Sequence, residues 1–111
     1  MKRLPALLLI FLLPALTACD RGRTPEERLY REHCAKCHGI DGSGNTPAYM
    51  GEQYADLTDD IWRAGGSEYA IRSVIRGGVF GKMPGYPQLS DQEVDLLVKY
   101  LRTLRPPGTS R

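Results

Sequence analysis

The sequence lacks the features that mark several large classes of protein. Its lysines and arginines form no basic stripe and it contains no nucleic-acid-binding motif, so nothing indicates a nucleic-acid partner. No segment alternates apolar and polar residues convincingly with a period of two, so little or no β-sheet is expected. No internal repeat is visible. These absences leave a single small domain made of helices and loops.

Cysteine and histidine are scarce, with three and two residues in the chain, and this scarcity limits the possible metal chemistry. Two cysteines and one histidine stand together in the run Cys34-Ala35-Lys36-Cys37-His38. This spacing is typical of a c-type haem attachment site. Each thiol can form a thioether to one haem vinyl group, and the adjacent imidazole can bind the iron as proximal ligand. We therefore predict one covalently bound haem c, held by Cys34 and Cys37, with His38 on the iron.

The same run allows three other interpretations. A structural disulfide needs only the two thiols. A zinc site requires four Cys or His ligands, and only His33 and Cys19 remain to complete it. A thioredoxin-like redox pair requires a neighbouring βαβ pattern, which is not visible.

We expect His33 on the helix surface rather than on the iron, because it lies beside the attachment site and cannot easily reach the far haem face.

The first 18 residues have the pattern of a secretory leader. A short basic head precedes an apolar run over residues 4–16, which is too short for a comfortable membrane span. The run ends in Leu16-Thr17-Ala18-Cys19, which resembles a bacterial lipobox. In such signals the cysteine receives diacylglycerol, the chain is cut before it, and the new amino terminus is usually acylated. Two or more acyl chains anchor a protein stably.

We therefore predict a lipoprotein signal peptide over residues 1–18, a lipid anchor at Cys19 and a tether over residues 19–24. The alternative is an ordinary secretory signal cut near Ala18, with Cys19 left as a stray thiol. Lipidation is favoured because it gives the odd cysteine a use. Asp20 resembles the enteric-type signal that keeps a lipoprotein in the inner membrane. The predicted location is the periplasmic side of the bacterial inner membrane.

The predicted leader also carries the excess positive charge of the chain. Without Lys2 and Arg3, 13 of the 15 basic residues remain against 13 acidic residues, so the formal net charge of +2 falls to zero. The rest of the chain is long enough for one small domain, and domains of this size often need a stabilising element besides their apolar core. A covalently held, largely apolar porphyrin would complete the core.

Three helices joined by long loops are predicted within a domain over residues 25–105, followed by a tail over residues 106–111. The first helix, over residues 25–35, follows a threonine that can cap it, and the second starts at Ser67. The third starts at Ser90 with a capping box. Its helical period is the clearest in the chain and runs through Val94, Leu97, Val98, Leu101 and Leu104.

The segment over residues 77–87 is too rich in glycine and proline for a helix, and Met83 lies in the middle of it. A thioether presented by such a loop is suited to be the second axial ligand of a haem iron. Met50 competes for this role, and the reach of the chain does not decide between the two. The Met83-Pro84 context favours Met83, which leaves Met50 as a gap-filling apolar residue.

Taken in order, these motifs resemble the class I c-type cytochromes. The closest resemblance is to the monohaem module also found fused to subunits of haem–copper oxidases, and it covers residues 28–104. It is carried by the haem motif and by the residues that follow it: Gly39, Asp41-Gly42, Gly44, Met83-Pro84, Leu89-Ser90 and Tyr100-Leu101. The resemblance implies an all-α class I cytochrome c fold, with about three helices and long loops around one covalent haem. It also implies His38 and Met83 as axial ligands and electron transfer as the role.

The resemblance implies roles for two further residues. Tyr30 is expected to pack against the last helix near Leu97 and Tyr100. The carbonyl of Pro47 is expected to accept a hydrogen bond from the proximal imidazole. Independently of the resemblance, Trp62 remains open between a core residue and a contact of the cofactor.

Three functions are compatible with these features. The first is a membrane-tethered periplasmic electron carrier, which is not an enzyme because both axial positions of the iron are filled by protein. The second is the same domain as a fixed haem subunit of a respiratory oxidoreductase complex. The third, a haem sensor or catalyst with an open sixth site, requires Met83 to be off the iron. We expect a monomeric domain whose redox partners are respiratory donor and acceptor complexes. Three cations form a docking rim or are scattered surface charges: Lys36, Lys82 and Arg76.

Overall fold

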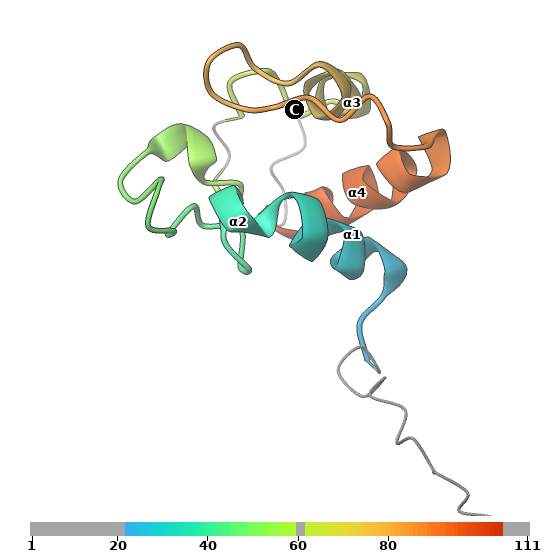
Figure 1. Cartoon of the computed structure of the whole chain (residues 1–111), viewed down its shortest axis with the longest axis horizontal. Coiled ribbons are helices and arrows are strands. Elements are labelled where there is room, and N and C mark those ends of the chain that lie inside the picture. Colours follow the sequence, from blue (N-terminus) through green and yellow to red (C-terminus); the bar gives the residue numbers. More distant parts are fainter. Residues whose placement is uncertain (1–21, 60–61, 106–111) are drawn as a thin grey trace, which may run out of the picture.

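The computed structural model describes residues 22–59 and 62–105 (Figure 1). This part of the chain forms α1 (Pro25–His33), α2 (Ala35–His38), the 3-10 helix η1 (Gln53–Ala55), α3 (Glu68–Gly77) and α4 (Asp91–Thr103). The described residues form no β-strand, and one isolated bridge joins Val79 to Met83. The predicted all-α fold is confirmed. The predicted leader, Cys19 and the tail over residues 106–111 lie outside the described residues.

Side chains fix where the helices begin. The hydroxyl of Ser90 accepts a hydrogen bond from the Glu93 N–H at 3.1 Å, and the Glu93 carboxylate accepts one from the Ser90 N–H at 2.8 Å. This reciprocal pair is the capping box expected at α4. At α1 the hydroxyl of Thr24 accepts from the Glu27 N–H at 3.3 Å, while the Glu27 carboxylate pairs with Arg31 at 2.9 Å.

The predicted first helix is interrupted at Cys34. Helix α1 ends at His33 and α2 begins at Ala35, because Cys34 has a φ of −116°, far from the helical value of about −63°. The attachment motif therefore occupies a short helix of its own. The second predicted helix begins after Ser67, as expected, and it ends at Gly77.

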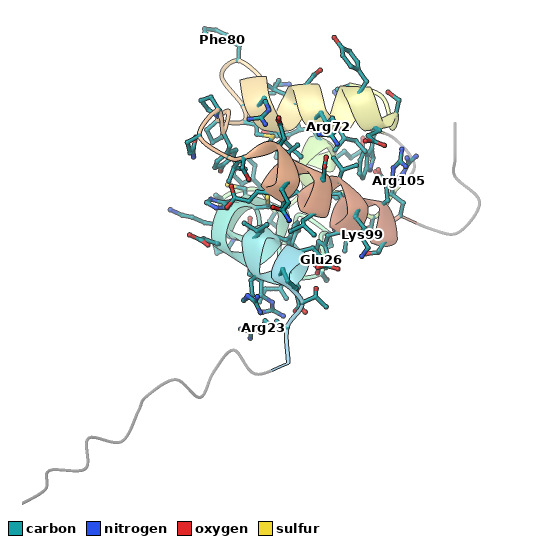
Figure 2. The ribbon with its side chains drawn as sticks, turned by 90° about the vertical axis from the view of Figure 1, so that its right-hand side faces the viewer. Arg23, Glu26, Arg72, Phe80, Lys99 and Arg105 are labelled. Atoms are coloured by element: carbon teal, nitrogen blue, oxygen red, sulfur yellow. The ribbon has the colours of Figure 1, made fainter. Side chains whose placement is uncertain are left out.

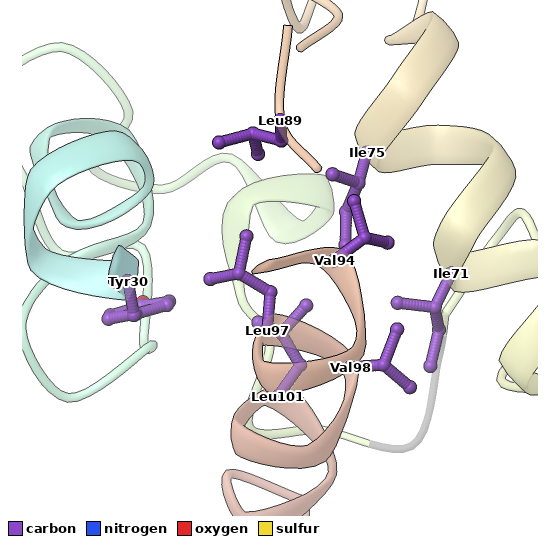
Figure 3. Packing of buried hydrophobic residues seen from close by; sticks show 8 residues of the cluster. All are labelled: Tyr30, Ile71, Ile75, Leu89, Val94, Leu97, Val98 and Leu101. Atoms are coloured by element: carbon purple, nitrogen blue, oxygen red, sulfur yellow. The ribbon is translucent and has the colours of Figure 1, made fainter. Parts of the chain in front are cut away.

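Three helices meet in one apolar core, with α4 between α1 and α3 (Figure 3). The ring of Tyr30 is fully buried, and its centroid lies 4.9 Å from that of Tyr100. Its hydroxyl donates to the carbonyl of Gly39 at 2.7 Å and so ties α1 to the end of α2. The expected packing of Tyr30 on the last helix is confirmed. The buried cluster consists of Tyr30, Ile71, Ile75, Leu89, Val94, Leu97, Val98 and Leu101.

Ion pairs at the surface join the same helices. Glu26 of α1 pairs with Lys99 of α4 at 3.5 Å, and Arg72 of α3 pairs with Asp95 of α4 (Figure 2). Exposed pairs of this kind contribute about 0–1 kcal/mol each. The buried cluster therefore holds the helices together. No helix in the described part of the chain is both long and apolar enough to cross a membrane.

Candidate functional site

A cavity of about 410 Å³ lies beside the core, within the range of roughly 300–1,000 Å³ that is common for ligand pockets. Cys34, Cys37 and His38 line it from α2 and the residue before it, and Met83 lines it from the loop between α3 and α4. Figure 1 shows α2 and the α3–α4 loop in different parts of the fold. Aliphatic side chains supply much of the wall: Leu57, Ile71, Val74, Ile75 and Leu101.

The two cysteines of the motif lie one helical turn apart. The N–H groups of Cys37 and His38 donate to the carbonyl of Cys34 at 3.2 and 2.9 Å, so the chain between the sulfurs forms a turn of helix. Residues three apart on a helix share a face, which places both sulfurs on the cavity side. The structure joins the two cysteines by no disulfide, and burial raises the pKa of the Cys34 thiol to about 11 before any haem is attached.

The imidazole of His38 is oriented by a backbone carbonyl. Its Nδ1 lies 2.7 Å from the carbonyl oxygen of Ala55, and because that oxygen can only accept, Nδ1 carries the proton. The lone pair of Nε2 is then left for a metal, as in other histidine ligands held by a second hydrogen bond.

The acceptor expected from the resemblance was Pro47, and the structure corrects this expectation. Pro47 is exposed, whereas Ala55, at the end of η1, is buried beside the His38 ring. Gly44 makes the approach possible, since a Cβ there would lie 2.8 Å from the carbonyl carbon of Ala55. The sequence carries no signal for Ala55, because the group that acts is a backbone carbonyl.

The two competing methionines lie in different environments. Met83 is half-buried and lines the cavity, whereas Met50 is 72% exposed and does not line it. The interpretation of Met50 as a gap-filling residue is therefore wrong. Of the two thioethers, the structure brings that of Met83 together with Cys34, Cys37 and His38.

Trp62 and His33 both contribute to the cavity wall. The indole of Trp62 also packs against the buried cluster and donates to the carbonyl of Leu57 at 3.3 Å. The guanidinium of Arg105 lies 4.7 Å from the centre of its ring. Trp62 is therefore both a core residue and part of the cavity wall. The expectation that His33 is a helix-surface residue is corrected. Its ring is half-buried, lines the cavity and meets the ring of Tyr86 edge-on at 5.5 Å.

Three tyrosines in the wall were not predicted from the sequence: Tyr49, Tyr54 and Tyr86. The chain has six tyrosines, and their spacing follows no period that separates these three from the others. Only the path of the loops brings them to the cavity.

The three cations considered for a docking rim do not act alike. Lys36 is exposed, and the ammonium of Lys82 lies 4.8 Å from the centroid of the Tyr54 ring at the cavity wall. Arg76 instead donates to the carbonyl of Leu89 at 2.7 Å and pairs with Asp91, which ties α3 to the start of α4.

These residues fit a covalently bound haem. Two thiols on one helical face suit two thioether bonds, and the oriented imidazole and the thioether of Met83 suit the two axial positions of an iron. The aliphatic wall suits a porphyrin. A zinc site is not supported, since the part of the chain that the structure describes has no group of three His, Cys, Asp or Glu placed to hold a metal.

Comparisons with known proteins agree with this arrangement. Residues 23–101 match a family model described as cytochrome c oxidase, cbb3-type, subunit III. The chain is similar to the cbb3-type cytochrome c oxidase subunit CcoP of Rhodobacter capsulatus, with 33% identity over 89 residues, 73% of this chain and 29% of that protein. It is also similar to the dihydro-heme d1 dehydrogenase of Pseudomonas aeruginosa, with 35% identity over 108 residues, 94% of this chain and 20% of that protein. The chain thus spans less than a third of either relative.

This chain is also similar to the solved structure of the KustC0563 c-type cytochrome, over nearly the whole length of that cytochrome. The match has a TM-score of 0.62 and 30% sequence identity, and it covers 73% of this chain and 98% of that one.

Proposed function

We propose a function from the premise that the chain belongs to the cytochrome c family of cbb3-type oxidase subunit III and so binds haem c covalently. The proposed function is the transfer of single electrons through a haem ligated by His38 and Met83. The observation that carries the proposal is that Cys34, Cys37, His38 and Met83 all line one cavity. When bound, haem supplies a one-electron couple, and methionine ligation raises its potential above that of a bis-histidine haem.

Each residue has a distinct part in this proposal. Cys34 and Cys37 hold the cofactor, and Ala55 keeps the His38 ring in one orientation. The thioether of Met83 would be the second protein ligand of the iron and would so exclude external ligands. Trp62 and the aliphatic wall exclude water. With no vacancy for a substrate, the site is a carrier of electrons and not a catalyst.

The proposed carrier is tethered by a lipid at Cys19 to the periplasmic side of the inner membrane. The support is the lipobox-like sequence Leu16 to Cys19. Its partners are respiratory donor and acceptor complexes, with Lys36 and Lys82 beside the site as docking cations. A second candidate is a fixed haem subunit of a respiratory oxidoreductase complex. The specific observation in its favour is that the family model describes an oxidase subunit.

Replacement of the two methionines tests the ligation. Met83→Ala should abolish the weak long-wavelength band of methionine-ligated ferric haem, lower the reduction potential and let azide bind the oxidised iron, since the axial sulfur is lost. Met50→Ala is the matched control and should change none of these, because Met50 is exposed. Optical spectra, redox titration and azide titration of both variants measure the effects. Ready azide binding by the unaltered protein would instead indicate a sensor or catalyst with an open sixth site.

A further inference from the structure

The loop that carries Met83 is held by hydrogen bonds within the loop and by a hydrogen bond to α3. The N–H groups of Val79 and Met83 donate to each other's carbonyls, both at 2.9 Å. The Tyr86 N–H donates to the carbonyl of Ile75 at 2.8 Å. Phe80, near the tip, is fully exposed and points away from the molecule (Figure 2). Within the described chain, none of the loop's backbone hydrogen bonds reaches the side of the cavity that carries His38.

The phenol of Tyr86 makes that connection. Its hydroxyl donates at 2.9 Å to the carbonyl of His33, which lies 53 residues earlier in the sequence. His33 is the last residue of α1 and directly precedes Cys34. Burial raises the pKa of the Tyr86 phenol, so the donor proton is retained at neutral pH. One side chain therefore links the methionine loop to the residue next to the attachment motif.

A second phenol contacts the same loop. Tyr49, in the segment that follows His38, donates its hydroxyl to the carbonyl of Lys82 at 3.5 Å, directly before Met83. This distance is long for an O–H···O hydrogen bond, so the contact is weaker than that of Tyr86. The Tyr49 ring is supported edge-on by the ring of Tyr54, with centroids 6.2 Å apart.

We propose that Tyr86, with Tyr49 as a weaker second, is a positioning residue for Met83. Each phenol holds the methionine loop against the histidine-bearing side of the cavity and so favours the bound sulfur over an exchanging ligand. The inference rests on the proposed ligation of the iron by Met83. The net free energy of one such hydrogen bond corresponds to about a fivefold change in an equilibrium constant. Its loss should therefore shift the equilibrium between the Met83 sulfur and an external ligand by about that factor.

The test uses the full-length, haem-loaded protein with the variants Tyr86→Phe and Tyr49→Phe. Tyr69→Phe is the matched control, since that ring is 80% exposed on α3 and does not line the cavity. Azide is titrated into each oxidised protein, and the long-wavelength methionine band is followed. Tyr86→Phe should bind azide about fivefold more tightly than the unaltered protein. Tyr49→Phe should show a smaller gain, and Tyr69→Phe should show none.

The outcomes separate the possible failures. If Tyr86→Phe lowers the denaturation midpoint but binds azide like Tyr69→Phe, the phenol serves only folding and the proposal is overturned. If Met83→Ala leaves the methionine band unchanged, the ligation itself is wrong and the positioning role falls with it. Phenylalanine keeps the ring that packs on His33, so Tyr86→Phe should fold. Should it fail to load haem, Tyr49→Phe carries the test, and an azide affinity equal to that of Tyr69→Phe overturns the proposal.

Discussion

The two side chains proposed to bind iron are prepared by different means. His38 needs one hydrogen bond, from Nδ1 to the carbonyl of Ala55, and this bond fixes both the orientation of the ring and the free nitrogen. Met83 has a flexible, unbranched side chain with no donor of its own, so its place depends on the loop around it. The histidine is thus positioned by a single contact and the methionine by the path of a segment.

At the same scale, the cysteines are expected to carry the covalent bonds. Replacing both Cys34 and Cys37 with alanine removes both possible thioethers, so acidified organic solvent should extract the pigment. The intact mass of the remaining chain should then lack haem. Each single alanine variant should keep haem through one bond, and Met50→Ala should retain it fully. Haem that stays with the double variant through extraction would contradict the assignment.

Among the elements, the methionine loop contains two glycines with a positive φ. Gly78, the C-cap of α3, has a φ of +69°, and a Cβ there would lie 2.4 Å from the carbonyl oxygen of Met83. Gly81, at the tip of the same loop, has a similar φ of +71°, but a Cβ there would meet nothing within 4 Å. Gly78 also has a ψ of −167°, outside the left-handed helical region, so a side chain there meets both a strained backbone and a close approach, whereas one at Gly81 meets no close approach.

We expect Gly81→Ala to lower the free energy of unfolding by about 1–2 kcal/mol, the usual cost of a side chain in this conformation. Gly78→Ala should cost about 1–3 kcal/mol more, because the methyl group collides with the backbone of Met83. Only Gly78→Ala should weaken the methionine band, since only it displaces that residue. Denaturant unfolding and visible spectra of the two haem-loaded variants measure both effects. Equal losses in the two variants would show that the close contact relaxes freely.

For the whole molecule, the core and the cavity are continuous. Ile71, Ile75 and Leu101 belong to the buried cluster and also line the cavity. A porphyrin in the cavity therefore extends the apolar core that α1, α3 and α4 build, as expected for a domain too small to bury a large core of its own.

The attachment of the whole molecule to a membrane is expected to depend on Cys19. Cys19→Ser removes the sulfur that would accept diacylglycerol, so the precursor should remain uncut before residue 19 or be released in a differently cut, soluble form. Cell fractionation and gel mobility measure this outcome, and Arg21→Ser is a neighbouring control that keeps the thiol. Unchanged membrane association and mobility of the Cys19→Ser protein would favour an ordinary secretory signal.

Local patterns in the sequence were sufficient for much of the fold and for one side of the site. The spacing of Cys34, Cys37 and His38 lies within a single helical turn, so their shared face follows from helical geometry alone. The capping side chains of α3 and α4 and the apolar period of α4 are equally local, and the structure confirms these helices. The sequence pattern did not indicate the non-helical backbone at Cys34. The first predicted helix is therefore divided at that residue into α1 and α2.

Only the tertiary structure decided which distant segments meet at the site. It chose Ala55 over Pro47 beside His38, and it brought Met83, which the sequence already favoured over Met50, to the same cavity as His38. It also brought His33 into the wall. A backbone carbonyl has the same chemistry at every residue, and a thioether has the same chemistry at every methionine. The carbonyl that orients His38 is therefore selected by the path of the long loops, which no local sequence pattern records.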